Sequence, residues 1–306
     1  MTAQRIIPNI WCDRNAEEAG AFYASVFGGS SSVVGRYPEE GLPDFQKDFA
    51  GKAVTVDVEI EGFQITLINA GSEFRPNPTI SFLLNVDPRR FGGEGAARAR
   101  IDEIWGRLSE GGTAMMRLTS YPHSAYYGWI EDRFGVSWQL MLTEASDETS
   151  PDEEPAPFIV PDLLFVGPAQ SRAREAIDFY TGLFPDSGAG MTVGYPAAQG
   201  PANAGDVMFA EFRLAGQPFA AMDSAAEMST RFDCGVSLEV RCDDQAEIDR
   251  LWDALSTVPE AEACGWCADR FGVSWQIVPS NMGELMARPG AYGHMMQMKK
   301  LIIADF

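Results

Sequence analysis

Apolar positions recur along this chain at two spacings, one typical of helices and one typical of strands. In residues 19–27 the apolar side chains fall at i, i+3, i+4, i+7 and i+8, and residues 176–184 repeat that spacing. Each segment therefore carries one apolar stripe of an α-helix. Residues 54–61 instead alternate apolar and polar side chains, which predicts a strand with one buried face. We expect helices that pack their stripes on a sheet.

The chain repeats itself. Residues 132–139 return letter for letter as residues 269–276, and the helical stripe of residues 101–108 returns at residues 248–255. An identity of that length containing a Trp indicates a duplicated domain. Within the repeated Asp-Arg-Phe-Gly, Asp can bond the nearby backbone and Gly can adopt positive φ. We predict a tight turn between two strands there, with its Asp as a turn former rather than a catalytic acid.

The predicted elements group into four βαβββ modules, two in each half of the chain, which places the protein in the α+β class. Between the halves, residues 146–157 contain five carboxylates and three prolines without any apolar periodicity. Such a segment cannot bury a core and is typical of a linker. We therefore divide the chain into a first domain at 1–144, an acidic Pro-rich linker at 145–157 and a second domain at 158–306.

The composition is strongly acidic, with 44 Asp and Glu against 23 Lys and Arg and a formal net charge of -21. A surface this negative repels phosphate backbones and anionic lipids, so we expect neither nucleic-acid nor membrane partners. The charge favours solubility, and it also attracts cationic small molecules. The sequence contains neither a secretory signal pattern nor an apolar run of about 20 residues, so we expect a cytoplasmic protein.

The five cysteines fit reduced thiols better than a disulfide framework. Cys264 and Cys267 have the spacing of a redox pair, but we place them in a strand, where residues i and i+3 point to opposite faces. We expect them to stay reduced and apart. A zinc site shared with Cys234 and Cys242 is the alternative.

The repeat unit resembles the vicinal oxygen chelate superfamily, which includes glyoxalases, bleomycin-resistance proteins and extradiol dioxygenases. Within it, the chain is most similar to the PhnB-like group whose domain is named 3-demethylubiquinone 3-methyltransferase. This resemblance implies tandem glyoxalase-like domains, each with a curved mixed sheet around a cavity and helices outside. The residues that carry it are 16–19, Phe22, Tyr23, Phe27, 80–81, 101–105 and 128–139 in the first half, and 240–245, 264–266 and 295–301 in the second.

Enzymes of that superfamily hold a divalent metal with His, Glu or Gln on the first, fourth, fifth and eighth strands of each domain. In this sequence only Gln139 and Gln276 occupy such positions, and the two histidines, His123 and His294, fall in a loop and in the C-terminal tail. A lone amide holds a divalent ion poorly, so we predict no metal. We also predict no cofactor and no methyl transfer, because no predicted strand runs into the Gly-rich turn that an adenosyl cofactor needs.

Two carboxylates, Asp57 and Glu211, fall at matching points of the third strand in each half, on the face opposite the apolar one. In the implied fold that face lines the cavity, where a desolvated carboxylate can act as a general base; a solvated strand face is the alternative. We expect Asp57 with Gln139 in one cavity and Glu211 with Gln276 in the other. The full set of predicted ligand-binding residues, which an ordinary core would also explain, is Trp11, Tyr37, Trp129, Gln139, Tyr195, Trp266 and Gln276.

These observations predict a metal-independent small-molecule-binding protein of the PhnB-like kind, which sequesters or senses a ligand in its cavities. The cationic class of ligand follows from the net charge. The alternative is an enzyme of the same fold, of isomerase, lyase or hydrolase type, with Asp57 or Glu211 as its base. The sequence leaves a homodimer open.

Overall fold

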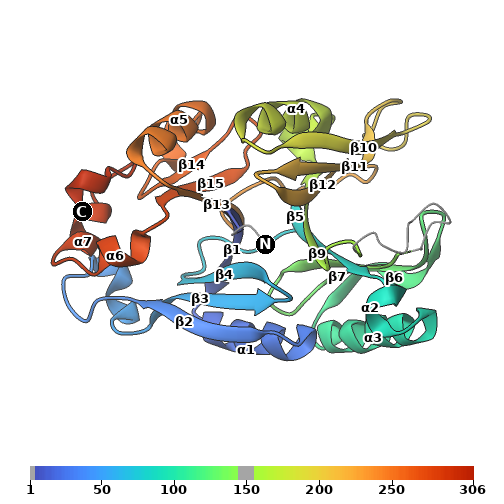
Figure 1. Ribbon diagram of the computed structural model, residues 1–306, viewed down its shortest axis with the longest axis horizontal. Helices are drawn as coiled ribbons and strands as arrows, with labels where there is room; N and C mark the ends of the chain where they lie inside the picture. Colours follow the sequence, from blue (N-terminus) through green and yellow to red (C-terminus); the bar gives the residue numbers. More distant parts are fainter. Residues whose placement is uncertain (1–3, 144–154) are drawn as a thin grey trace.

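The protein contains two curved β-sheets side by side, with the long helices on their outer faces (Figure 1). A computed structural model describes residues 4–143 and 155–306, so most of the predicted linker at 145–157 lies outside the described residues. Helices α1 (Ala16–Phe27) and α3 (Glu94–Ser109) lie along one side of the molecule. Helices α4 (Ala173–Leu183) and α5 (Gln245–Leu255) lie along the opposite side. No helix of the described residues is long and apolar enough to cross a membrane.

The strands form a seven-stranded sheet, called sheet A here, and an eight-stranded sheet, called sheet B. In spatial order sheet A contains β14 (Trp266–Ala268), β15 (Ser274–Pro279), β13 (Val236–Cys242), β1 (Ile6–Asp13), β4 (Phe63–Ala70), β3 (Ala53–Ile60) and β2 (Ser30–Arg36). Sheet B contains β10 (Gly188–Gly194), β11 (Val207–Leu214), β12 (Gln217–Asp223), β9 (Ile159–Phe165), β5 (Ile80–Val86), β8 (Ser137–Leu142), β7 (Ser124–Glu131) and β6 (Thr113–Tyr121).

Each sheet combines one module from each half of the chain. At the centre of sheet A, β1 pairs antiparallel with β13, with Pro8 opposite Leu238. At the centre of sheet B, β5 pairs antiparallel with β9, with Phe82 opposite Pro161. The α+β class is confirmed, and three modules have the predicted βαβββ order, while the fourth, from β13 to β15, has one strand fewer. The expectation that each repeat closes its own sheet is wrong. The first strand of each module has one unpaired edge, and it can pair with the first strand of a module from the same half or from the other half. The local sequence pattern is the same in both cases, so it does not distinguish these two pairings.

The local predictions hold within this arrangement. The stripe of α1 is buried and packs on β2, β3 and β4, while α4 packs in the same way on β10, β11 and β12. In β3 the apolar residues Val56, Val58 and Ile60 are buried in the core under α1. Gly28 ends α1 in the left-handed conformation, with φ of 82°, which glycine adopts without steric cost.

The repeated turn is a buried cluster of hydrogen bonds within the apolar core. The carboxylate of Asp132 is buried and accepts hydrogen bonds from the backbone N–H groups of Phe134 at 2.8 Å and Val136 at 3.1 Å. It also accepts hydrogen bonds from Trp138 Nε1 and from Tyr23 Oη, each at 2.9 Å. The backbone bonds confirm the predicted role of this Asp as a turn former.

The second copy of the turn has the same cluster of hydrogen bonds, centred on Asp269. Asp269 accepts hydrogen bonds from the backbone of Phe271 and Val273, from Trp275 Nε1 at 2.8 Å and from Tyr180 Oη at 2.6 Å. In both copies the tyrosine lies on a helix that packs against the other sheet. Helix α1 packs on sheet A and reaches the turn after β7 of sheet B, and α4 packs on sheet B and reaches the turn after β14 of sheet A. These bonds therefore link the two sheets.

We predict that Asp132→Asn lowers the free energy of unfolding by about 3 kcal/mol, because an amide leaves two of the four buried donors facing an N–H group. Tyr23→Phe is the matched control: it removes one donor and should cost only about 1 kcal/mol. Urea unfolding followed by Trp fluorescence measures both. A free energy of unfolding for Asp132→Asn within 1 kcal/mol of the wild type would show that the hydrogen-bond cluster contributes little to stability.

The shared sheets also predict how the first repeat behaves alone. In a fragment of residues 4–143, β1 and β5 lose their partners β13 and β9 and expose long apolar edges, which favour pairing with another chain. In the repeat, β13 corresponds to β5 and β9 corresponds to β1. In a dimer of the fragment, β1 of each copy can therefore pair with β5 of the other copy and rebuild both sheets. We expect a dimer by light scattering after gel filtration; a well-folded monomer would contradict the argument.

Candidate functional site

The concave faces of the two sheets match residue for residue. On sheet A, Thr66 of β4 lies between Asn9 of β1 and Asp57 of β3. On sheet B, Ala220 of β12 lies between Asp162 of β9 and Glu211 of β11. Asp57 and Glu211 therefore occupy equivalent places, as the repeat predicts.

The partners of these two acids differ from the prediction. Gln139 lies on β8 and shares sheet B with Glu211, whereas Gln276 lies on β15 and shares sheet A with Asp57. The expected pairs, Asp57 with Gln139 and Glu211 with Gln276, are wrong because the sheets exchange modules between the halves. Trp129 and Trp266 lie opposite Gln139 and Gln276, respectively, so each sheet keeps one Trp beside its Gln.

On sheet A the polar side chains bond one another. Asp57 accepts hydrogen bonds from Thr66 Oγ1 and from Gln64 Nε2, both at 2.7 Å. On β13, on the far side of β1, the partly buried Glu239 accepts a hydrogen bond from Arg241 Nε at 2.9 Å. Burial raises the pKa of the Glu239 carboxyl, while the Arg241 charge opposes that shift. This face is a closed polar network rather than a free carboxylate.

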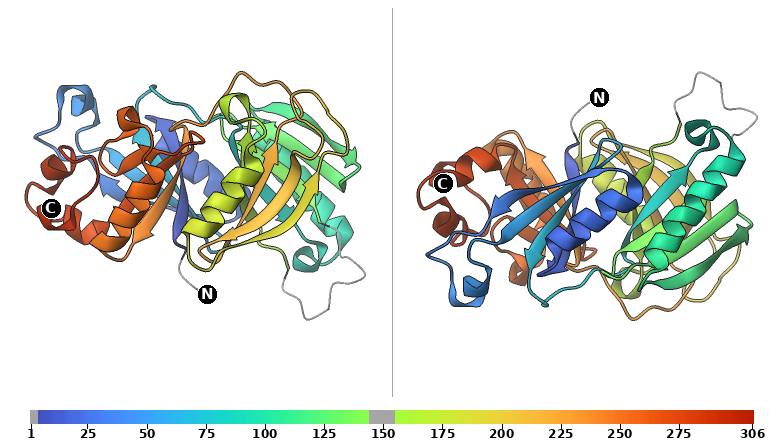
Figure 2. Two further views of the ribbon diagram at one scale, coloured as in Figure 1. Left: turned by 90° about the horizontal axis from the view of Figure 1, so that it is seen from above. Right: turned by 90° about the horizontal axis from the view of Figure 1, so that it is seen from below.

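The C-terminal segment spans the open end of sheet A. It contains α6 (Met282–Met286) and α7 (Ala291–Met295), which lie beside the loop that carries η1 (Asp44–Phe49) in all three views (Figures 1 and 2). Tyr292 Oη donates to Gln46 Oε1 at 2.6 Å on the β2–β3 side. On the β14 side, the N–H of Cys264 donates to the carbonyl of Met298 at 2.8 Å. The segment thus joins the two arms of the curved sheet.

Several predicted ligand-binding aromatics take part in packing. Trp11 and Trp266 meet edge to face with ring centroids 6.2 Å apart, and Trp11 Nε1 donates to the carbonyl of Gly71 at 2.7 Å. Tyr37 and Tyr195 are buried, and each hydroxyl donates to a backbone carbonyl, of Asn69 at 2.8 Å and of Asp223 at 3.0 Å respectively. These hydrogen bonds occupy the polar atoms with which Trp11, Tyr37 and Tyr195 would bind a ligand.

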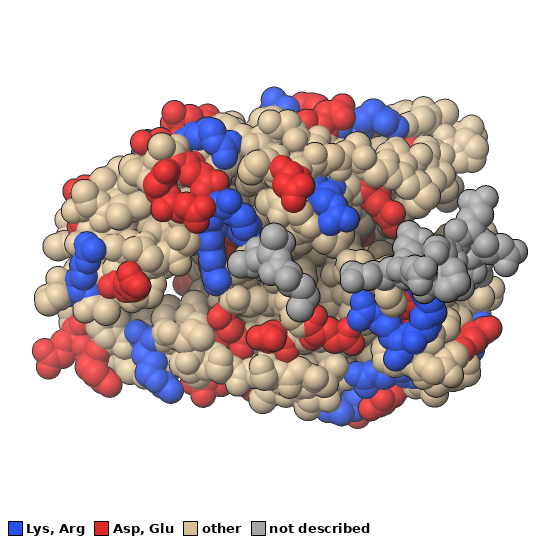
Figure 3. Space-filling view, in the orientation of Figure 1, with Lys and Arg blue, Asp and Glu red and all other residues tan. Residues whose placement is uncertain are grey.

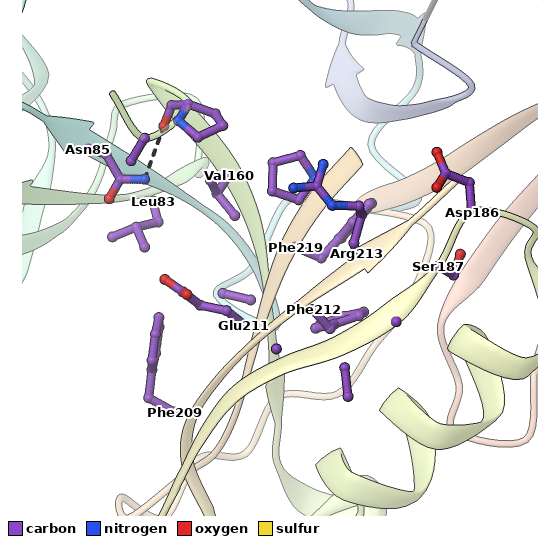
Figure 4. Close-up of a pocket in the computed structure, with 17 residues that line it drawn as sticks. Leu83, Asn85, Val160, Asp186, Ser187, Phe209, Glu211, Phe212, Arg213 and Phe219 are labelled. Carbon is purple, nitrogen blue, oxygen red and sulfur yellow. Dashed lines mark hydrogen bonds between the residues drawn. The ribbon is translucent and has the colours of Figure 1, made fainter. Parts of the chain in front are cut away.

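Sheet B holds a cavity of about 600 Å³ on its concave face (Figure 4). Its floor is apolar and includes Leu83, Val160 and Ala220, against which Phe209 packs. The exposed Glu211 points into this space toward Leu83 (Figure 4), and among the described residues its carboxylate has neither a hydrogen-bond nor an ion-pair partner. Arg213 lies two residues further along β11 and also lines the cavity, and its Nη1 donates to the carbonyl of Gly216 at 2.7 Å. The lining also includes the polar side chains of Asn85 and Ser187. A concave site that combines apolar surface with polar groups is typical of small-molecule sites.

The free carboxylate has a local cause. Strand register places Ala220 and Pro218 of β12 where sheet A has Thr66 and Gln64. Neither a methyl group nor a proline ring can donate a hydrogen bond. The acid that Thr66 and Gln64 hold in sheet A is therefore left available for a ligand in sheet B.

A second acid, Asp162, lies in the floor of sheet B and was missed from the sequence. It is 1% exposed, and burial raises the pKa of its carboxyl to about 7, although hydrogen bonds from Gln139 and Ser81 oppose the shift. Gln139 Nε2 donates to Asp162 Oδ2 at 2.6 Å. The signal was present as a single acid in the otherwise apolar run Ile159–Phe165.

Metal-binding geometry is not found in the part of the chain that the structure describes: no group of three or more His, Cys, Asp or Glu could hold an ion. Gln276 donates to Ser237 Oγ at 2.9 Å. All five cysteines are free thiols. Cys264 lies in a tight turn with φ of 51° rather than in the strand where it was expected, and β14 begins after it, at Trp266.

Comparison with known proteins gives one family. The model of the family described as 3-demethylubiquinone-9 3-methyltransferase matches residues 4–141 and again residues 157–278. A solved putative 3-demethylubiquinone-9 3-methyltransferase, PhnB protein, from Bacillus cereus is 28% identical over 46% of this chain and 100% of its own, with a TM-score of 0.38. No curated protein matches the chain.

Two longer solved structures span most of the chain. A putative dioxygenase from Bacillus subtilis is 12% identical over 99% of this chain and 93% of its own, with a TM-score of 0.47. A glyoxalase I mutant from Zea mays is 10% identical over 92% of this chain and 95% of its own, with a TM-score of 0.48.

The buried acid predicts a pH dependence of stability. The pKa of an unfolded Asp is about 3.9, so between that pH and about 7 the folded protein keeps a proton on Asp162 that the unfolded chain has released. The stability from Asp162 therefore falls as pH rises through this window and is constant above it. Because Asp162→Asn cannot titrate, its free energy of unfolding relative to wild type should rise by about 3 kcal/mol between pH 5 and pH 8. Urea unfolding at both pH values decides it; parallel curves would contradict the shift.

Proposed function

The chain belongs to the 3-demethylubiquinone-9 3-methyltransferase family, and from this membership and the cavity of sheet B we propose that it binds a small cationic molecule without a metal. The binding site is the concave face of sheet B, and sheet A serves as its structural counterpart. In this chain the PhnB-like, glyoxalase-like domain occurs twice in tandem. Membership of the family does not by itself establish an activity. Methyl transfer is not part of the proposal.

The observation that carries this proposal is the unpaired carboxylate of Glu211 beside the apolar floor of the sheet B cavity. A carboxylate gains a charge-assisted hydrogen bond when it meets an ammonium or guanidinium group. Leu83, Val160 and Phe209 offer apolar surface beside it for the body of a ligand. A molecule with one cationic group and an apolar chain matches both features.

The charge of the whole protein favours the same ligand class. The formal net charge is -21, and acidic side chains occupy both the upper and the lower half of the face seen in Figure 3. A field of that sign raises the local concentration of cations and speeds their encounter with the site. Anionic ligands are disfavoured for the same reason.

The second candidate function is an enzyme with a cavity carboxylate as general base, of isomerase, lyase or hydrolase type. Thr66 and Gln64 occupy both oxygens of Asp57, so this hypothesis now depends on Glu211. Its support is that a base must reach the substrate proton directly, and Glu211 lines the cavity.

The test uses hexylammonium as a probe, titrated at pH 7 and low salt and followed by NMR. We expect Glu211→Gln to weaken binding about tenfold, the equivalent of about 1.4 kcal/mol for a charge-assisted hydrogen bond. Asp57→Asn is the matched control, because it removes the same charge at the equivalent position of sheet A, and it should change the dissociation constant less than twofold. Equal effects of the two variants, or none, would refute the assignment of the site to Glu211.

A further inference from the structure

Asp162 has one carboxylate oxygen that the described residues leave without a partner. Its Oδ2 accepts a hydrogen bond from Gln139 Nε2, whereas Oδ1 is buried and bonds nothing in the part of the chain that the structure describes. A buried polar atom without a partner costs about 1–3 kcal/mol. Such atoms are rare in native proteins, so this one requires an explanation.

Asp162 lies next to residues that line the cavity. Strand β9 has β5 on one side and β12 on the other. The groups that hold Asp162, Ser81 of β5 and Gln139 of β8, both lie on the β5 side. On the other side of β9, Ala220 of β12 is the residue opposite Asp162 and lines the cavity, whereas Asp162 lies just beneath that lining.

The protein cannot satisfy this oxygen by turning Gln139. The amide of Gln139 donates to Asp162 and to Ser81 Oγ at 2.9 Å, which uses both of its hydrogens. Its carbonyl oxygen accepts a hydrogen bond from Tyr127 Oη at 2.5 Å. A rotation of the amide would break all three bonds, so the orientation is locked.

Sheet A lacks this acid at the equivalent position. There Asn9 replaces Asp162, and its Nδ2 donates to the carbonyl of Ile7 at 3.0 Å. Sheet A carries its floor acid elsewhere, at Glu239 of β13, and Arg241 and Asn9 bond that carboxylate. The two carboxyl-bearing strands of sheet B are separated by β12 alone, which places them about 10 Å apart.

From this geometry we propose that Asp162 is the second recognition group of the cavity, and that the ligand is a diamine, with one amino group on Glu211 and the other on Asp162 Oδ1. The inference rests on the proposed function and names its ligand class. Ala220, between the two acids, contacts the apolar spacer. Met141 and Phe209, partly buried over the floor, shift to admit the second amino group, as the flexible Met side chain allows.

The test compares 1,6-diaminohexane with hexylamine, which carries one amino group on the same spacer. In the wild type we expect the diamine to bind at least fivefold more tightly. Asp162→Asn should abolish that preference while it leaves the affinity for hexylamine within twofold. Asp57→Asn removes an equal charge from sheet A and should preserve the preference. The shorter 1,3-diaminopropane, which cannot span both acids, should show none of it.

The outcomes separate the two proposals. If hexylamine binds through Glu211 but the diamine gains nothing that depends on Asp162, the second recognition group is refuted and the binding site stands. If hexylamine binding is insensitive to Glu211, the site itself fails. Should Asp162→Asn not fold, a crystal structure of the wild-type protein with 1,6-diaminohexane decides: a nitrogen within hydrogen-bond distance of Asp162 Oδ1 supports the proposal, and its absence there overturns it.

Discussion

Two buried carboxylates hold the structure together where the sheets meet. Asp132 and Asp269 each order a turn through two backbone bonds, and each binds a tyrosine from a helix of the opposite sheet. A carboxylate taken out of water is stable only when donors surround it, so turn, Trp and Tyr must assemble together. Aromatic rings pack around these carboxylates, and the ring centroids of Phe27 and Trp138 are 4.7 Å apart. The relative placement of the sheets, and of both concave faces, depends on this assembly.

The exchange of modules determines which groups meet in each cavity. It unites Glu211 with Gln139 and Asp162 in sheet B, and Asp57 with Gln276 in sheet A. The chemistry of each face then depends on small differences between equivalent positions. Thr and Gln beside one acid consume its hydrogen-bonding capacity, whereas Ala and Pro beside the other leave it free.

The two sheets therefore differ in chemistry. Sheet A carries a self-bonded polar network, and the C-terminal segment bridges its two arms. Sheet B carries the cavity, the unpaired Glu211 and the buried Asp162. Each sheet combines modules from both halves, so this difference lies between the sheets rather than between the repeats.

The sequence by itself determined the features that depend on neighbours along the chain. The stripes of residues 19–27 and 176–184, the alternation in residues 54–61 and the repeated turns follow from helical and strand geometry, and the duplication equated Asp57 with Glu211. Only the tertiary structure decided which modules share a sheet, because equivalent strand edges are locally identical. That choice re-paired Glu211 with Gln139. It also brought Asp162 beside Gln139, a contact between residues of different halves that no periodicity encodes.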